Sequence, residues 1–182
     1  MKLVCYGDSN TYGWDPRFFS GDRYDDPWPE IVGRMTGCDV VNLGEPGRMI
    51  PGRKEHFEWF REDIRNSAPD LLTIMLGTND ILNMYDPAGE KPAAQMDAFI
   101  CYILDNSLAD RILLLSCPKV EVYDRPYMEG LADISDRYRE IADRRGIEFA
   151  DPFRWEIPLA YDGIHFSEEG HRIFAGKLSD YI

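Results

Sequence analysis

The sequence predicts an α/β protein in which a parallel sheet of about five strands lies between two layers of helices, a three-layer α/β/α sandwich. Short apolar runs of strand length alternate with longer stretches in which apolar residues recur every three or four positions. The apolar runs are almost continuous, which is typical of parallel strands covered on both faces. The chain has 182 residues, and domains usually have about 100–200 residues. We therefore expect residues 1–182 to form a single domain.

The strands are expected at the five apolar runs, taken in chain order. These runs occupy residues 3–6, 39–43, 71–76, 112–115 and 147–150. Amphipathic stripes at residues 57–64, 96–104 and 131–142 predict three of the helices that connect them. A last helix is expected after Ser167, which suits an N-cap position, with Glu168 and Glu169 in the first turn.

The connections after the strands are long and contain prolines and aromatic residues. They are predicted at residues 14–30, 84–92, 118–127 and 152–161. Ligands of open α/β sheets bind beyond the carboxyl ends of the strands, where such connections lie. Their aromatic side chains could line a pocket, anchor the loops or form a subunit interface, so a homo-oligomer stays open.

The charge of the chain excludes several kinds of partner. Twenty Lys and Arg against 33 Asp and Glu give a net charge of −13, and such an acidic surface repels nucleic acid and anionic lipid. No run approaches the roughly 20 apolar residues of a membrane span. Charge and glycine follow the start too early for a signal peptide, so a cytoplasmic location is expected. Cys5 and Cys117 lie in apolar runs and are expected to be small buried residues rather than parts of a disulfide framework.

Four short clusters follow these strands and carry the candidate chemistry. Residues 7–11 (Gly-Asp-Ser-Asn-Thr) could present the hydroxyl and the backbone N–H of Ser9 together, form an ordinary turn, or bind phosphate. Asp8 is interpreted as a loop residue that accepts backbone hydrogen bonds. Gly44 could expose its N–H to a ligand, or could simply make the turn that leaves its strand. Asn79, in Gly-Thr-Asn-Asp (77–80), could donate its amide to an oxyanion or cap a helix.

The fourth cluster offers a general base. Asp162 precedes His165 by three residues, so its carboxylate could orient the imidazole through one ring nitrogen while the other accepts a serine proton. Of the other two histidines, His56 has no acidic partner at a telling spacing, and His171 is expected to pack inside the last helix or lie on the surface. A metal site made by Asp162, His165 and His171 is disfavoured, because zinc-binding patterns such as HExxH and paired CxxC are missing.

In their order and spacing these clusters resemble the SGNH (GDSL-like) hydrolase family. The resemblance spans residues 7–171, and residues 7–14 together with Gly47 and Arg48 are most similar to its arylesterase and acyltransferase (perhydrolase-like) branch. It implies a flavodoxin-like three-layer fold, and a serine ester hydrolase that needs no cofactor and no metal. The α/β-hydrolase superfamily is excluded, since the chain has no GxSxG motif.

The resemblance assigns roles to five residues. Ser9 is the nucleophile, His165 the base and Asp162 its orienting partner, while the Ser9 N–H, the Gly44 N–H and the Asn79 amide form the oxyanion hole. Glu45 and Pro46 depart from the family's pattern after the oxyanion glycine. A carboxylate there disfavours an oxyanion unless it is turned away or paired, and Arg48 could pair with it.

The predicted function is therefore the hydrolysis of small-molecule esters with short acyl or acetyl groups, through an acyl-serine intermediate. Two other functions stay open: a flavodoxin-like protein that binds phosphate or FMN at residues 7–11, and an SGNH scaffold without activity. The sequence does not distinguish acetylated sugars, lipid fragments, thioesters and other esters as substrates, or hydrolysis from acyl transfer.

Overall fold

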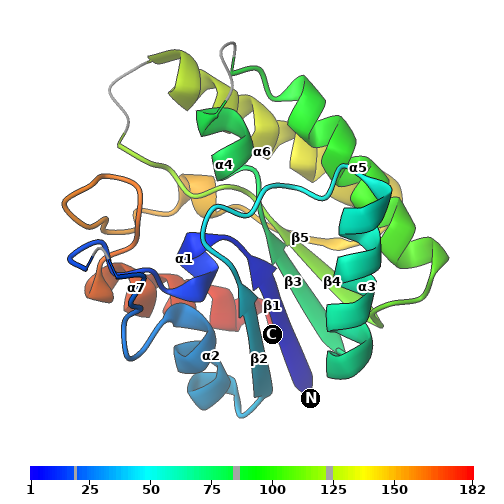
Figure 1. Ribbon diagram of the computed structural model, residues 1–182, viewed down its shortest axis with the longest axis horizontal. Helices are drawn as coiled ribbons and strands as arrows, with labels where there is room; N and C mark the ends of the chain where they lie inside the picture. Colours follow the sequence, from blue (N-terminus) through cyan, green and yellow to red (C-terminus); the bar gives the residue numbers. More distant parts are fainter. Residues whose placement is uncertain (19, 84–86, 122–124) are drawn as a thin grey trace.

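The computed structural model describes residues 1–18, 20–83, 87–121 and 125–182. Five strands alternate with the helices along the chain (Figure 1). The elements are β1 (Lys2–Gly7), α1 (Ser9–Tyr12), α2 (Trp28–Thr36), β2 (Asp39–Gly44), α3 (Lys54–Ser67), β3 (Leu71–Met75), α4 (Thr78–Leu82), α5 (Glu90–Asp105), β4 (Arg111–Leu115), α6 (Arg125–Arg145), β5 (Glu148–Ala150), the 3-10 turn η1 (Pro152–Arg154), α7 (Glu168–Leu178) and the 3-10 turn η2 (Ser179–Tyr181).

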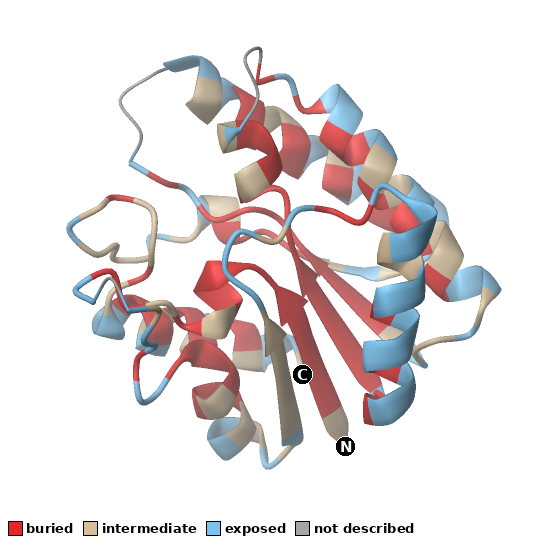
Figure 2. Ribbon diagram, in the orientation of Figure 1, coloured by how far each residue is buried: buried red, intermediate tan, exposed pale blue. Residues whose placement is uncertain are grey.

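The strands form one parallel sheet in the order β2-β1-β3-β4-β5. Successive side chains of a strand point to opposite faces, so the sheet divides the apolar residues into two cores. Val4 and Tyr6 of β1 pack with α3, α5 and α6, whereas Leu3 and Cys5 pack with α2 and α7. Figure 2 shows β1, β3 and β4 buried between these layers and β2 only half-buried at the edge. The predicted three-layer α/β/α fold is confirmed.

The observed helices correct the predicted connections. Of the stretch predicted as a loop at 14–30, Trp28, Pro29 and Glu30 begin α2 instead. Pro29 lies in the first turn of that helix, where a missing N–H costs no intrahelical bond. The loops predicted at 84–92 and 118–127 likewise end inside α5 and α6, and their residues 84–86 and 122–124 lie outside the described part of the chain. Helices α1, α2 and α4 were not predicted: α1 and α4 have only four or five residues, which show no periodicity, and no apolar stripe was assigned to the nine residues of α2.

The predicted start of the last helix and the predicted burial of two cysteines agree with the structure. Ser167 is the N-cap of α7, and its hydroxyl accepts a hydrogen bond from the Gly170 N–H at 3.0 Å. Cys5 and Cys117 are fully buried free thiols, and burial raises the pKa of Cys5 to about 12. Across the described ranges, every helix is too short or too polar to span a bilayer.

Candidate active site

The predicted site residues meet at the carboxyl edge of the sheet. Gly7 at the end of β1 pairs in register with Gly44 of β2 on one side and with Met75 of β3 on the other. The segments that leave these three strands therefore start next to one another, and the loop before α7 approaches them from the opposite side of α1 (Figure 1). The parallel sheet thus brings the segments after β1, β2 and β3 together, and the loop before α7 adds the cluster that contains Asp162 and His165.

Ser9 occupies the first position of α1, directly after the turn that leaves β1. Asp8 is the N-cap, and its carboxylate accepts the Asn10 N–H at 3.0 Å, which agrees with its interpretation as a loop residue. Gly7 is required here, because a Cβ at this position would lie 2.0 Å from the Thr11 Oγ1 atom. This tight turn leaves Ser9 8% exposed at the surface of the site.

Ser9, His165 and Asp162 form a continuous hydrogen-bonded line. The Ser9 Oγ atom lies 3.0 Å from His165 Nε2, and His165 Nδ1 lies 2.6 Å from Asp162 Oδ2. The other Asp162 oxygen accepts the N–H groups of Ile164 and His165, both at 3.0 Å. Burial raises the pKa of Asp162, but the hydrogen bonds from His165 and Ile164 outweigh it, so the pKa lies below its ordinary value. Asp162 is therefore a carboxylate at neutral pH.

Asn10 holds the histidine loop against α1, a role that sequence reasoning missed. Its side-chain oxygen accepts the Phe166 N–H at 2.8 Å, and its amide donates to the Ile164 carbonyl at 3.2 Å. These two bonds fix the backbone on both sides of His165 to the residue that follows Ser9. Asn10 is 2% exposed, so little water competes for either bond. The sequence signal was only that an asparagine follows the serine, which does not reveal a partner more than 150 residues away.

Two of the predicted oxyanion donors, Asn79 and Gly44, differ in whether they have a hydrogen available for a bond to a ligand. Asn79 uses one amide hydrogen to donate to the Arg48 carbonyl at 3.0 Å, which leaves its second amide hydrogen for a ligand. It does not cap α4, whose N-cap is Gly77 and has no side-chain cap bond. The Gly44 N–H donates to Asn42 Oδ1 at 2.9 Å, so a ligand would have to share or displace this bond. A side chain at position 44 would clash with the backbone of α1, since a Cβ there would lie 2.1 Å from the Tyr12 nitrogen.

Glu45 is turned toward solvent and paired. Its carboxylate accepts a hydrogen bond from Arg48 Nη2 at 2.7 Å, and its side chain is 66% exposed. The pairing with Arg48 that the sequence suggested is present, and it removes the main objection to a carboxylate after Gly44.

Two buried carboxyl groups flank the site. Asp8 precedes Ser9, and Asp80 follows Asn79 and accepts the Ile50 N–H. Burial raises the pKa of Asp8 to about 7, with a smaller contribution from the nearby Asp80. Burial likewise raises the pKa of Asp80 to about 6. Protonation of these groups lowers the negative charge next to the place where an oxyanion would form.

The remaining histidines lie outside this hydrogen-bonded line. His171 is fully buried, its Nδ1 atom accepts the Trp28 N–H at 3.2 Å, and Tyr24 and Phe166 pack edge-on against its ring. Of the two roles that the sequence left open for this histidine, packing and a surface position, packing is the one observed. His56 stacks on Trp59 of the same helix, with ring centroids 5.4 Å apart. Within the described ranges, no group of three His, Cys, Asp or Glu side chains is arranged to hold a metal ion.

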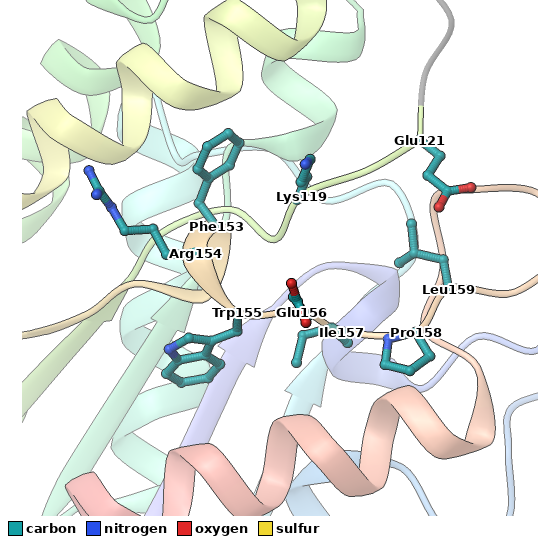
Figure 3. A pocket seen from close by; sticks show the side chains of 9 residues that line it. All are labelled: Lys119, Glu121, Phe153, Arg154, Trp155, Glu156, Ile157, Pro158 and Leu159. Carbon is teal, nitrogen blue, oxygen red and sulfur yellow. The ribbon is translucent and has the colours of Figure 1, made fainter.

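A cavity beside the histidine loop, rather than over Ser9, is drawn in Figure 3. It has a volume of about 590 Å³ and is lined by Lys119, Glu121, Phe153, Arg154, Trp155, Glu156, Ile157, Pro158 and Leu159. Its wall residue Glu121 donates its N–H to the Gly163 carbonyl at 2.6 Å. The aromatic residues of the predicted loops serve as both walls and anchors: Trp155 lines this cavity and packs on Phe174, whereas the Tyr161 hydroxyl donates to the Pro16 carbonyl.

The fold and the ordered clusters at its carboxyl edge define the class of the protein, a hydrolase with the SGNH-type α/β fold. The family follows from comparison with known proteins: residues 5–173 match the model of the GDSL-like lipase/acylhydrolase family. The chain belongs to this family, and the prediction of an ester hydrolase is confirmed. The assignment favours the hydrolase over the flavodoxin-like binding protein that the sequence left open.

Named relatives and solved structures agree with this family. An acetylxylan esterase from Geobacillus stearothermophilus is 27% identical over 164 residues, which cover 81% of this chain and 71% of that protein. The fold is similar to a carbohydrate acetylesterase from Sinorhizobium meliloti, with a TM-score of 0.84 and 21% identity over 99% of this chain and 97% of that one. It is also similar to the aryl esterase of M. smegmatis, with a TM-score of 0.82, 21% identity and the same coverage.

Proposed function

We propose that the protein cleaves short acyl esters, with Ser9 as nucleophile, His165 as general base and Asp162 as the residue that orients the histidine. The observation that carries this proposal is the unbroken line of hydrogen bonds from Ser9 Oγ to His165 Nε2 and from His165 Nδ1 to Asp162. In this arrangement Asp162 accepts a hydrogen bond from the Nδ1–H group of His165, so that Nε2 carries the lone pair that faces the serine.

The reaction proceeds in two acyl transfers. His165 takes the Ser9 proton as the hydroxyl oxygen bonds to the ester carbonyl carbon, and it returns that proton to the alcohol oxygen when the ester bond breaks. Water then attacks the acyl-serine; His165 accepts a proton from the water and gives it back to Ser9 as the acid leaves. No other reactant is needed.

The negative oxygen of each tetrahedral intermediate is stabilised by the Ser9 N–H and the free amide hydrogen of Asn79. Gly44 adds a third donor when its N–H is shared between Asn42 and the oxyanion. Such donors act on charge that develops only in the transition state, so they raise kcat rather than tighten substrate binding.

The substrate class proposed is a small ester with an acetyl or short acyl group. It is supported by relatives whose names state acetylxylan, carbohydrate acetyl and aryl esters. Three hollows among the described residues are open and lined by charged residues as well as apolar ones, and such a lining suits a short acyl group better than a long acyl chain.

The test is a panel of 4-nitrophenyl esters from acetyl to palmitoyl, assayed with the wild-type chain and with Ser9→Ala and His165→Ala. We expect kcat/KM to be highest for acetyl or butyryl, and each substitution to bring turnover near background. Since the residues act as one unit, the double variant should be hardly slower than either single variant. Full activity of Ser9→Ala would exclude the mechanism, and a wild-type chain inactive on every ester would indicate a silent scaffold. A maximum at palmitoyl would overturn the substrate class alone.

A further inference from the structure

Arg48 connects the backbone segments that carry all three proposed oxyanion donors. Its Nη1 atom donates to the carbonyl of Gly7 at 3.1 Å and to the carbonyl of Leu43. Gly7 lies two residues before Ser9, and Leu43 directly precedes Gly44. The backbone carbonyl of Arg48 in turn accepts the amide of Asn79 at 3.0 Å. One residue therefore contacts the ends of β1 and β2 and the side chain that follows β3.

The guanidinium is held in place by its surroundings. It lies over the Tyr6 ring, with 4.2 Å between its central carbon and the ring centroid, a favourable cation–π distance. The second nitrogen, Nη2, donates to Glu45. The Arg48 side chain is only 14% exposed, whereas that of Glu45 is 66% exposed. The planar group is thus held by the Tyr6 ring on one face and by hydrogen bonds along its edge, and it has little freedom to move when a substrate binds.

Arg48 also places a positive charge in this region. Asp8 and Asp80 are buried beside the donors, and the chain carries a net charge of −13. Arg48 acts on Asp8 in the direction that favours its carboxylate, while burial and Asp80 act against it. A fixed positive charge at this point makes the local potential more favourable to an oxyanion than the acidic surface would.

We propose that Arg48 is a positioning residue for ester hydrolysis, which sets the Ser9 turn, the Gly44 strand end and the Asn79 amide in the geometry that receives the oxyanion. The inference rests on the proposed function and adds to it a residue that touches neither nucleophile nor base. Lysine cannot replace arginine here, because an ammonium group has no planar fork to serve two carbonyls and a carboxylate while stacking on a ring.

The experiment measures kcat and KM for 4-nitrophenyl acetate, together with thermal melting, for Arg48→Met and Arg48→Lys. We expect kcat of Arg48→Met to fall about 10²-fold with little change in KM, since misplacing a donor by about 1 Å costs that much. Arg48→Lys should lose at least about tenfold. The matched control is Arg34→Met. Arg34 lies on α2 and pairs with Asp26, and its substitution should keep the wild-type kcat.

A combination with Asn79→Ala separates positioning from general stability. If Arg48 acts through Asn79, the double variant should be less impaired than the product of the two single effects. Independent, multiplicative effects would overturn this part of the proposal. A folded Arg48→Met with kcat within threefold of wild type would overturn the whole of it. If Arg48→Met does not fold, Arg48→Lys decides, and wild-type kcat in that variant is the refuting result.

Failure of the proposed function has a different signature. In that case Ser9→Ala keeps the wild-type rate, and a 4-nitrophenyl phosphonate, which acylation-competent serines attack, does not label Ser9 in the wild-type chain. If Ser9 is labelled and Arg48→Met is labelled equally fast, the mechanism stands and the role of Arg48 falls.

Discussion

His171 should make the folded protein less stable in mild acid. The histidine is fully buried, its Nδ1 atom accepts the Trp28 N–H, and its Nε2 atom has no partner among the described residues. Burial lowers its pKa from 6.5 to about 3; Asp26 opposes this shift, while His165 and Arg23 add to it. Protonation would place a charge between Tyr24 and Phe166 and remove the acceptor of the Trp28 N–H.

The sign and size of the effect follow from the pKa difference. The unfolded chain binds a proton near pH 6.5 and the folded chain only near pH 3, so acid favours the unfolded chain. Each unit of difference corresponds to about 1.36 kcal/mol. The loss of stability begins as the pH falls below 6.5, reaches about 2 kcal/mol at pH 5 and about 4 kcal/mol at pH 3, and approaches about 5 kcal/mol only below pH 3.

The assay is urea unfolding at intervals from pH 8 to pH 4.5, for the wild-type chain and His171→Asn. Asparagine keeps an acceptor for the Trp28 N–H but does not titrate, so residue 171 should add no pH dependence to the stability of this variant. Asp8 and Asp80 act in the opposite direction, because their raised pKa values give stability in acid that is lost as the pH rises through about 6 and 7. Their effect is common to both chains and cancels in the difference. The difference in free energy of unfolding should shrink by about 2 kcal/mol between pH 8 and pH 5; a constant difference would refute the reasoning.

Three further predictions concern catalysis. Asn79→Ala should lower kcat about 10²–10³-fold with little change in KM, checked by steady-state kinetics; a lower melting temperature with normal kcat would instead indicate a structural role. Asp162→Asn should lower kcat at every pH from 5 to 9, because it removes both the charge and the acceptor that orient His165; a rate equal to wild type would contradict this role. Asn10→Ala should leave the Phe166 N–H unpaired and cost about 1–3 kcal/mol of stability, with a loss of kcat measured well below the melting temperature.

The fold was predictable because its signals are local and repeated. Each strand is an apolar run, each long helix carries an apolar stripe, and their alternation leaves few possible topologies. The elements that were missed had weak signals. The first turn of α2 contains Pro29, which was taken as a loop residue, and α1 and α4 are shorter than two helical turns.

The site was predictable only as a set of residues at one edge of the sheet. Parallel strands bring their carboxyl ends together, so Ser9, Gly44 and Asn79 had to be neighbours once the sheet was known. Patterns in the sequence do not specify the direction in which a backbone N–H points. That direction decides whether Gly44 donates to a ligand or, as observed, to the side chain of Asn42 two residues earlier.

The same limit explains why Asn10 and Arg48 escaped sequence reasoning as parts of the site. Both act through backbone atoms of distant segments: Asn10 binds Ile164 and Phe166, and Arg48 binds the carbonyls of Gly7 and Leu43. A side chain that binds backbone atoms imposes no requirement on the type of residue it contacts, so no motif marks the partner. In the proposed site such contacts would nevertheless hold the reacting groups in place, because the proposed nucleophile, base and donors lie on four separate segments. The sheet aligns these segments only at their starting points. In the proposed site, Ser9, His165 and Asp162 would supply the chemistry, and Asn10 and Arg48, which bind the main chain, would supply the geometry on which that chemistry depends.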